Sequence, residues 1–589
     1  MQKKQACIQW RILISLMCYG GLINSLQAQE QIFVHTDKSI YVTGENIWLS
    51  IYCLNSVSHK ASSLSKLVYV ELLDAQAQPL IQEKIALEKG TGKGQLFIHP
   101  DINSGVYYLR AYTSWMRNFD TALFFEQALT VIHPFRAPAE QLFTEFSSNT
   151  VDQPNNHKIS EQTQAESSLS ISLAESVYGQ RQKISLSIVT ELQDISSKHA
   201  QLSISIHKVH PKLNIAQTNI GDILSPKSKK TAIPMPQDIK YLPEPMAPIL
   251  QGKISNSSGR LPQLLLNIPG ASAEMYSVPI DEQGNFSLEV SPATRSGDLL
   301  FWSVDQSLEA ADIQLHSPFI SAPLSHPKSS LLSEDWKALI ESYSVNSQIS
   351  HIYAEDTHIQ GLEVIDQRLR TPFYGEADFS YQLDAYTRFP NLDEVFLEYI
   401  SYARKHRIKG KRYIYLWDEY ASIFSTANTV LFDTAALCLI DGVPILDPDF
   451  LWQFDVLKVS NIDLVTKKYV VGQQLFYGIV HFTTYKYDFG GLDIPAYLIR
   501  KHYQAIQKPK VFYHPNYSLA SMLNSRIPDY RSTLYWEPQL VLAKTETSLS
   551  FFSSDDEGTY KVEVNGITQD GILLYAEGIF EVRNGGMRK

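Results

Sequence analysis

Apolar and polar residues alternate along most of the chain with a period of two, which predicts β-strands. Between residues 29 and 136, short runs rich in β-branched and aromatic residues occupy 32–34, 47–54, 67–73, 95–98 and 106–112. Gly, Asn, Thr and Ser separate these runs, and such residues favour turns. The spacing therefore predicts an antiparallel β-sandwich of about one hundred residues in this part of the chain.

Two motifs in the same region carry a resemblance to a known family. The runs HTDKSIY at 35–41 and GENIW at 44–48 resemble the opening of the N-terminal domains of α-2-macroglobulin-like proteins. The run SGVYYLRAY at 104–112 is similar to the strand near the end of such a domain. The resemblance implies a macroglobulin-like β-sandwich over 29–136.

The next three segments are also predicted from pattern. Residues 137–165 are rich in Ser, Gln and Asn and indicate a polar linker. Alternation returns after this linker and predicts a second β-sandwich over 166–245. Over 246–330, the runs GKI, IPG and DEQGNF at 252, 268 and 281 resemble the carboxypeptidase regulatory-like domain, which is a transthyretin-type sandwich.

The pattern changes class beyond a connecting helix and loop expected at 331–379. Asn391 followed three residues later by Glu394 is typical of a helix start. Apolar residues then recur at offsets of 0, 3, 4, 7, 8 and 11 from Leu392, which predicts one buried stripe on a helix over 391–406. Strand-like runs follow at 413–416, 437–440, 462–465 and 479–484. Residues 380–490 are therefore predicted to form an α/β domain.

Asp441 and Gly442 stand between two apolar runs, an arrangement that predicts a tight two-residue turn. The runs IDGVP at 440–444, IDLV at 462–465 and GIVHFTT at 478–484 together resemble the plug domain of TonB-dependent receptors. This resemblance makes five residues candidates for a structural turn or an interaction surface, namely Asp441, Gly442, Val443, Pro444 and Gly478.

The chain is too short to supply the barrel that such a plug would close. A receptor barrel has roughly 22 strands of about ten residues each, whereas only 99 residues (589 − 490) follow the plug-like segment. A separately encoded outer-membrane barrel would have to be the partner. The final segment, 491–589, is predicted to be a C-terminal β-sandwich, similar to the last domain of exported proteins that join macroglobulin-type and plug-like domains.

Composition and the N-terminus narrow the class of protein. Hydrophobic residues make up 44% and charged residues 19%, which is typical of a folded chain. A formal net charge of −11 argues against a nucleic-acid binder. Lys3, Lys4 and Arg11 precede or flank a short apolar run that leads to Ala28, a pattern that indicates a signal peptide over 1–28. We therefore expect export, with a mature chain beginning at Gln29, to the periplasm or the outer membrane.

The residues that could carry chemistry do not form a recognisable catalytic motif. Cys53 and Cys438 lie on apolar strands in separate predicted domains, so we expect two free, buried thiols. Neither precedes Gly-Glu-Gln, which argues against a thioester protease trap. His207 and His210 are three residues apart on a strand and should face opposite sides, so they are a poor metal pair. We expect no catalytic, cofactor-binding or metal-binding residues.

The fold class that follows is mainly β, with tandem macroglobulin- or immunoglobulin-like sandwiches, one α/β plug-like domain and a C-terminal β-sandwich. The leading function is a non-catalytic scaffold, adhesion or accessory protein of the envelope that acts through protein contacts and associates peripherally with the outer membrane. One alternative is a gate or accessory subunit of a separately encoded outer-membrane pore. Another is a glycan-active enzyme whose carboxylates meet only after folding.

Overall fold

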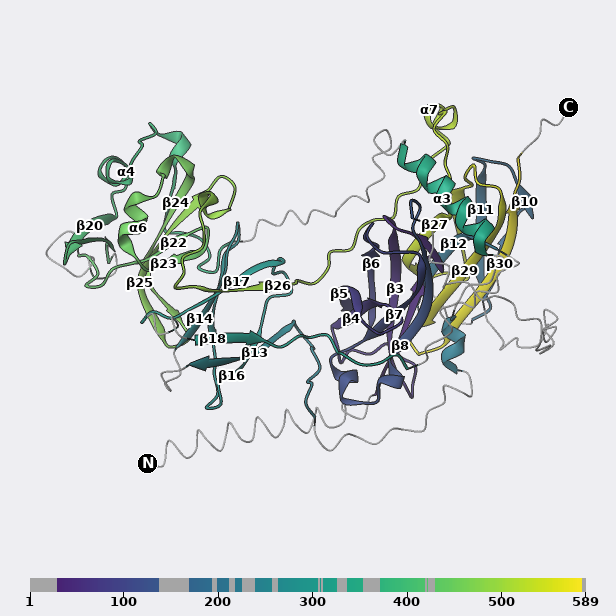
Figure 1. Ribbon diagram of the computed structural model, residues 1–589, viewed down its shortest axis with the longest axis horizontal. Coiled ribbons are helices and arrows are strands. Elements are labelled where there is room, and N and C mark those ends of the chain that lie inside the picture. Colours follow the sequence, from purple (N-terminus) through teal and green to yellow (C-terminus); the bar gives the residue numbers. More distant parts are fainter. Residues whose placement is uncertain are drawn as a thin grey trace. The chain divides into compact units, whose positions relative to one another are not determined.

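The computed structural model describes residues 29–136, 169–192, 199–210, 218–224, 239–256, 263–305, 308, 311–325, 336–352, 371–418, 421 and 430–584. The signal peptide expected at 1–28 and the linker expected at 137–165 lie outside these residues. The chain divides into two compact units (Figure 1). Unit 1 contains 1–247, 318–365 and 506–589, and unit 2 contains 248–317 and 366–505. The fold is mainly β, as predicted, and no described helix is long and apolar enough to cross a membrane.

The first sandwich of unit 1 confirms the strands expected between 29 and 136. Strands β1, β3 and β6 pair on one side, and β5 joins them to β4, β7, β8 and β2 on the other. Their alternating apolar side chains fill one core, which includes Phe33, Leu49 and Leu109. The bounds are β1 (Glu30–Thr36), β2 (Ile40–Val42), β3 (Asn46–Asn55), β4 (Leu67–Leu73), β5 (Pro79–Glu88), β6 (Thr91–Phe97), β7 (Gly105–Tyr112) and β8 (Phe125–Ile132).

The two further sandwiches predicted at 166–245 and 491–589 are one sandwich in the structure, so that division was wrong. Strand β12 lies between β27 and β29 (Figure 1). In this pairing Ile204 lies opposite Val564. The second sheet pairs β11 with both β9 and β28. The bounds are β9 (Leu169–Leu173), β10 (Val177–Tyr178), β11 (Lys183–Thr190), β12 (Ala200–Val209), β27 (Thr533–Leu542), β28 (Glu546–Phe552), β29 (Gly558–Thr568) and β30 (Leu573–Val582). Alternation indicates which side of a strand is buried, but it does not identify the pairing partner.

The β part of unit 2 has strands over 249–315, within the β domain expected at 246–330, and a further strand from far along the chain. One sheet has the order β16-β13-β18, and the other has the order β15-β14-β17-β26. Strand β26 comes from the segment predicted to begin the C-terminal sandwich, which is a second error in those boundaries. The bounds are β13 (Ile249–Asn256), β14 (Leu264–Ile268), β15 (Glu274–Val278), β16 (Asn285–Glu289), β17 (Gly297–Trp302), β18 (Ala311–Leu315) and β26 (Ile499–Tyr503).

The α/β part of unit 2 is a five-stranded sheet in the order β19-β24-β25-β22-β23, with a separate hairpin formed by β20 and β21. Its buried side chains share one core with Leu265, Met275 and Trp302 of the neighbouring β part, so the two form a single unit. The bounds are β19 (Phe379–Gln382), β20 (Ala403–Ile408), β21 (Lys411–Leu416), β22 (Leu437–Ile440), β23 (Val443–Ile445), β24 (Val459–Val471), β25 (Gln474–Thr484), α4 (Leu392–Glu398) and α6 (Pro448–Gln453).

The helix predicted over 391–406 is shorter than expected. Its start is confirmed, because the Asn391 side chain accepts a hydrogen bond of 3.0 Å from the backbone N of Glu394. It ends at Glu398, and residues from Ala403 onward pair as a strand with 411–416. Ile400 and Ala403 are buried, so their predicted burial is confirmed, although both residues lie beyond the end of the helix. Tertiary pairing here overrides the helical spacing.

The remaining elements connect or cover these sheets. Helix α3 (Trp336–Ile352), within the connection expected at 331–379, packs Trp336, Leu339 and Ile340 against Ile40 and Ile132 of the first sandwich. The short elements are η1 (Trp115–Asn118), η2 (Thr121–Leu123), η4 (Ile220–Leu224), η5 (Leu383–Ala385), η6 (Val456–Lys458), η7 (Phe489–Gly491) and α7 (Ala520–Leu523).

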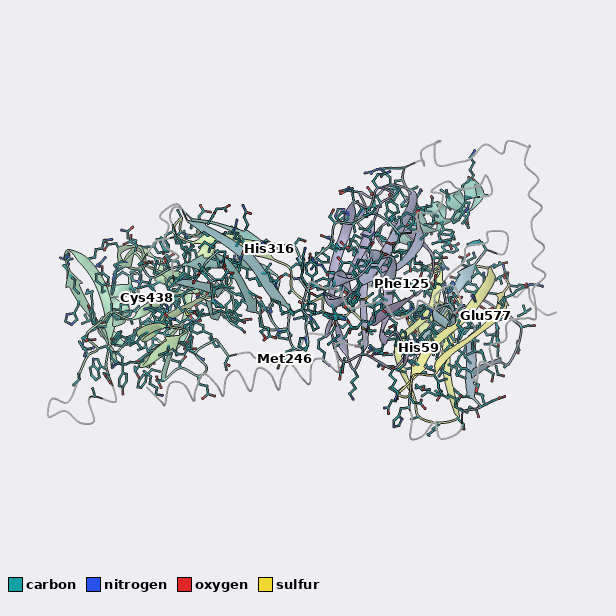
Figure 2. The ribbon with its side chains drawn as sticks, turned by 90° about the horizontal axis from the view of Figure 1, so that it is seen from below. His59, Phe125, Met246, His316, Cys438 and Glu577 are labelled. Atoms are coloured by element: carbon teal, nitrogen blue, oxygen red, sulfur yellow. The ribbon has the colours of Figure 1, made fainter. Side chains whose placement is uncertain are left out.

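The two thiols lie on apolar strands, as predicted. Cys53 is in β3 and Cys438, labelled in Figure 2, is in β22. Both are free and buried. Burial raises the pKa of Cys438 to about 12 and raises the pKa of Cys53 well above its usual value. Each thiol therefore behaves as a small apolar side chain and not as a nucleophile.

Candidate functional site

The turn predicted at Asp441 and Gly442 is present. Ile440 pairs with Val443 across it, so β22 and β23 are joined by two residues. Both residues have positive φ, at +49° for Asp441 and +86° for Gly442. These are the signs that a type I′ hairpin requires. The backbone expectation drawn from the Asp-Gly pair is therefore confirmed.

The turn is buried inside unit 2. The Asp441 carboxylate accepts hydrogen bonds from the backbone N of Thr484 at 2.8 Å, from its Oγ1 at 2.6 Å and from the backbone N of Phe489 at 3.0 Å. Asn267 of β14 donates from Nδ2 to the carbonyl of Gly442 at 2.9 Å. Burial raises the pKa of Asp441, and the hydrogen bonds from Thr484 act against that rise.

Close packing surrounds the two candidate glycines. A Cβ at Gly442 would lie 2.5 Å from the Cβ of Ala273, next to β15. Gly478 lies apart from the turn, in β25, with φ of +85°, and a Cβ there would lie 2.5 Å from Leu416. Val443 and Pro444 are buried in β23. The geometry gives all five candidates a structural role, while a role in association with a partner stays a prediction.

A second polar cluster, in unit 1, was not identified from the sequence. His35 of β1 places Nδ1 2.7 Å from the Ser203 hydroxyl of β12, and Tyr52 donates to the same hydroxyl at 2.9 Å. Ser205 contacts His207 Nδ1 at 2.9 Å and donates to the backbone carbonyl of Asp37. Ser203, Ser205 and His207 are on the polar side of β12, which alternation assigns to solvent. In the structure that side faces the first sandwich.

The HTDK run forms the centre of this cluster. The Asp37 carboxylate accepts hydrogen bonds from Thr533 Oγ1 at 2.7 Å, Tyr41 OH at 2.8 Å and Trp48 N at 3.0 Å. Lys38 donates to Glu45 at 2.8 Å and to the hydroxyl of Ser532 at 2.7 Å. The motif therefore joins the first sandwich to Thr533 and Ser532. These residues lie 496 positions after Asp37 and 494 positions after Lys38, respectively. Burial raises the pKa of Asp37.

A polar cleft of about 270 Å³ opens beside this cluster. Lys208 pairs with Asp556 at 2.5 Å on one wall, and Lys38 pairs with Glu45 nearby. The lining residues are Val42, Thr43, Gly44, Glu45, Lys208, Ser342, Tyr343, Asn346, Ser347, Tyr530, Ser532 and Asp556. Its hydroxyl, amide and aromatic groups can hold a small polar ligand. Each of its two carboxylates is already neutralised by a lysine, which does not favour either as a proton donor.

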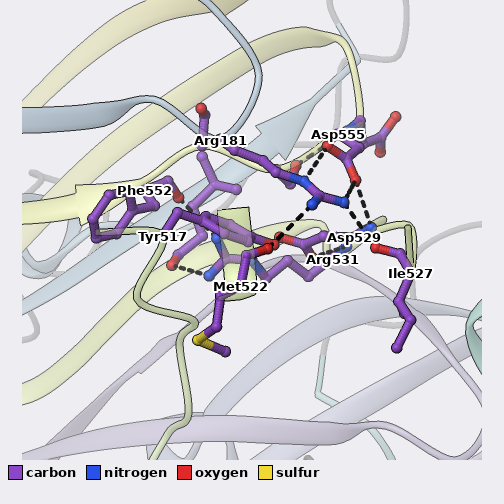
Figure 3. A network of polar contacts seen from close by, with 12 residues as sticks. Arg181, Tyr517, Met522, Ile527, Asp529, Arg531, Phe552 and Asp555 are labelled. Carbon is purple, nitrogen blue, oxygen red and sulfur yellow. Dashed lines mark hydrogen bonds and ion pairs between the residues drawn. The ribbon is translucent and has the colours of Figure 1, made fainter. Parts of the chain in front are cut away.

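An arginine clamp holds the segment before β27 against the second sandwich (Figure 3). Arg181 forms a two-pronged ion pair with Asp555, at 2.8 Å from Nε and 2.6 Å from Nη2. The same guanidinium donates to the backbone carbonyls of Ser525 and Ile527 at 2.7 and 2.8 Å. Every donor is used within the chain, so this cluster is structural and not a free anion site.

The buried histidines give a pH prediction. Burial, with a further contribution from Lys561, lowers the pKa of His207 to about 3, against about 6.5 in an unfolded chain. Between these values only the unfolded chain takes up the proton, so this contribution to stability is complete above pH 6.5 and is lost as the pH falls. Between pH 7 and pH 5, we expect the unfolding free energy of the parent chain to fall by about 2 kcal/mol more than that of His207→Asn.

Urea unfolding at the two pH values measures this difference. The pKa values of Asp37 and Glu563 are raised by burial and change stability in the opposite direction, but both residues are present in both proteins. Their effect therefore cancels in the comparison. Equal losses in the parent chain and in His207→Asn would contradict the prediction.

Comparisons with known proteins give structural likenesses only. No family model matches the chain, and no curated protein matches it. Escherichia coli α-2-macroglobulin activated by porcine elastase is similar over 94% of this chain and 44% of its own, with 9% identity and a TM-score of 0.24. Salmonella α-2-macroglobulin reacted with methylamine is similar over 94% of this chain and 39% of its own, with 8% identity and a TM-score of 0.24.

A DUF4785 family protein from Legionella pneumophila is similar over 30% of this chain and 39% of its own, with 12% identity and a TM-score of 0.13. The chain spans less than half the length of the proteins it resembles. At these TM-scores no residue role and no activity passes to this chain. The plug-like and carboxypeptidase regulatory-like resemblances stay predictions.

Proposed function

We propose that this chain is a non-catalytic protein of the bacterial envelope, in the periplasm or at the outer membrane, that acts as a scaffold or accessory subunit through protein contacts. The observation that carries the proposal is the buried joint around Asp37 and Lys38. Its hydrogen bonds fasten two sandwiches into one compact unit, which is what a scaffold requires. The HTDK run of the N-terminal region thus has a structural use.

The cleft also fits this proposal better than catalysis. Glu45 and Asp556 are the two carboxylates that line this cleft, and each is held by a lysine at hydrogen-bond distance. Burial raises the pKa of Asp556, but Lys208 opposes that rise. A general acid needs a carboxyl that is protonated and free to face the substrate. These pairings therefore speak against glycan hydrolysis in this cleft.

The gate alternative rests on the plug-like resemblance, and one observation favours it. The Asp-Gly hairpin implied by that resemblance has the expected backbone conformation. The same hairpin is covered by Asn267 and Ala273 of its own unit. A pore partner would therefore have to contact another surface of unit 2, and the alternative is tested by removing the whole unit.

The shared core of unit 2 means that the whole unit should be removed in that test, not its α/β part alone. Removing 380–490 alone would expose Trp302, Leu265 and Met275, which share a core with the removed part. Replacing both 248–317 and 366–505 by flexible linkers removes unit 2 and leaves unit 1 complete. We expect this deletion to abolish capture of an outer-membrane barrel while the circular dichroism of the sandwiches of unit 1 is kept.

The measurement is crosslinking in intact cells followed by purification of the full chain and of the deletion. The full chain should capture at least one defined envelope protein. If the deletion captures every partner that the full chain captures, the contacts lie in unit 1 and the gate alternative is wrong. If the full chain captures no protein from the envelope, the scaffold proposal is overturned.

A further inference from the structure

The β20–β21 hairpin of unit 2 carries a concentration of positive charge that the function above does not use. Between Ala403 and Trp417 the chain has six cationic residues and no Asp or Glu, in a protein whose formal net charge is −11. The cationic residues are Arg404, Lys405, Arg407, Lys409, Lys411 and Arg412. Every residue of β20 after Ala403 is exposed.

Ion pairs neutralise only part of this charge. Lys405 and Arg412 both contact Asp393, and Lys411 pairs with Asp447 at 2.9 Å. Two carboxylates against six cations leave a net charge of +4 (6 − 2). Among the described residues, neither Arg407 nor Lys409 has an ion-pair partner.

The strand register separates the two faces of the hairpin. Ala403 lies opposite Leu416, and Lys405 lies opposite Ile414. Ala403, Ile414 and Leu416 are buried, so the base of this face covers the core. Towards the turn the same face carries Lys405 and the pair of Arg407 with Arg412, and both Lys405 and Arg407 are exposed. The opposite face carries three further pairs, which are Arg404 with Tyr415, His406 with Tyr413 and Ile408 with Lys411.

Aromatic and apolar groups accompany Arg404 and Lys411 on this outer face. The Arg404 guanidinium lies 5.3 Å from the centre of the Trp417 ring, and the rings of His406 and Tyr415 are 5.2 Å apart. Ile408, beside the turn, is 45% exposed. Cations beside Tyr, Trp and an exposed aliphatic side chain are the combination found where protein meets the interface of a membrane.

We propose that this hairpin docks on the surface of a membrane containing anionic phospholipids. Its cations approach the headgroup phosphates, and Ile408 and the tyrosines enter the interfacial layer. An acidic protein would satisfy the charge but gives no reason for an apolar residue at the tip. The lipid surface accounts for both features. The proposal goes beyond the scaffold function and depends on other residues.

The test measures binding of the full chain to vesicles of phosphatidylcholine alone and to vesicles that also contain phosphatidylglycerol. We expect binding only with phosphatidylglycerol, weakening as salt is added. Each cation near such a surface contributes about fivefold to affinity, so Arg407→Gln with Lys409→Gln should weaken binding on the order of 25-fold. Ile408→Ser, which leaves the charge unchanged, should also weaken it.

The matched control is Lys253→Gln with Arg295→Gln, which removes two exposed cations elsewhere in unit 2. It should leave binding unchanged, and the circular dichroism of all variants should equal that of the parent chain. All variants share the same N-terminus, so its basic residues contribute equally. Equal losses in the control and hairpin variants would overturn the proposal. Binding to polyglutamate with no binding to anionic vesicles would overturn it in favour of an acidic protein partner.

Discussion

Replacing Gly442 by valine should destabilise unit 2 by about 3 kcal/mol or more. Two costs add at this position. A β-branched residue at positive φ costs roughly 1–2 kcal/mol, and forcing side-chain atoms into a filled space costs roughly 1–3 kcal/mol. The second cost applies because a Cβ here would lie 2.5 Å from Ala273 and 3.2 Å from Pro269. Hydrogen exchange read by peptide should show faster exchange in β14, β15 and β22.

The chain supplies a close control at Gly410. It follows Lys409 in the two-residue turn between β20 and β21, with φ values of +49° for Lys409 and +88° for Gly410. A Cβ at Gly410 would meet nothing within 4 Å. Gly410→Val should therefore show the backbone cost alone and be the milder variant. Equal destabilisation at both positions would show that packing around Gly442 adds nothing.

Removing the positive charge at Arg110 should strongly destabilise unit 1. Arg110 of β7 is fully buried and donates two hydrogen bonds to Glu126 of β8, at 2.9 and 2.8 Å. It also donates to the backbone carbonyls of Ala322 and Pro323 at 3.0 and 2.7 Å. Arg110→Met leaves a buried carboxylate without its cation. We expect a loss of about 3–5 kcal/mol, measured by urea unfolding.

Two further variants separate the buried charge from the lost packing. Arg110→Met combined with Glu126→Leu removes both charges and should recover most of the loss. Arg583→Met breaks an exposed pair with Glu581 and should change the unfolding free energy by less than about 1 kcal/mol. If the double variant is as unstable as Arg110→Met alone, the loss comes from packing and not from the unpaired carboxylate.

Local features of the fold could be predicted because neighbouring residues decide them. The Asp441–Gly442 turn follows from the backbone freedom of glycine at positive φ, and the helix start at Asn391 follows from one side chain meeting one backbone N–H. The strands of the first sandwich follow from alternation over a continuous stretch. The positions of Cys53 and Cys438 on apolar strands were predicted for the same reason.

The pairing of distant segments was decided only by the tertiary structure. Strand β12 pairs with β27 and β29, which lie more than three hundred residues later, and β26 completes a sheet of unit 2. The turn at Asp441 was predicted, but its burial by Asn267 and Ala273 was not. Alternation describes one strand and the side it buries. The partner is selected by shape and polar complementarity between whole surfaces, which no local pattern records.

The candidate sites show the same division. The sequence placed Ser203, Ser205 and His207 on the polar side of a strand, and periodicity alone assigns such a side to solvent. In the fold these residues meet His35 and Asp37, where burial lowers the pKa of both histidines to about 3. The sequence by itself determined the strands of the first sandwich, the Asp441–Gly442 turn and the run of cations between Ala403 and Trp417, although it predicted a helix where β20 begins. The tertiary structure decided which polar residues are buried, because desolvation depends on what packs over them.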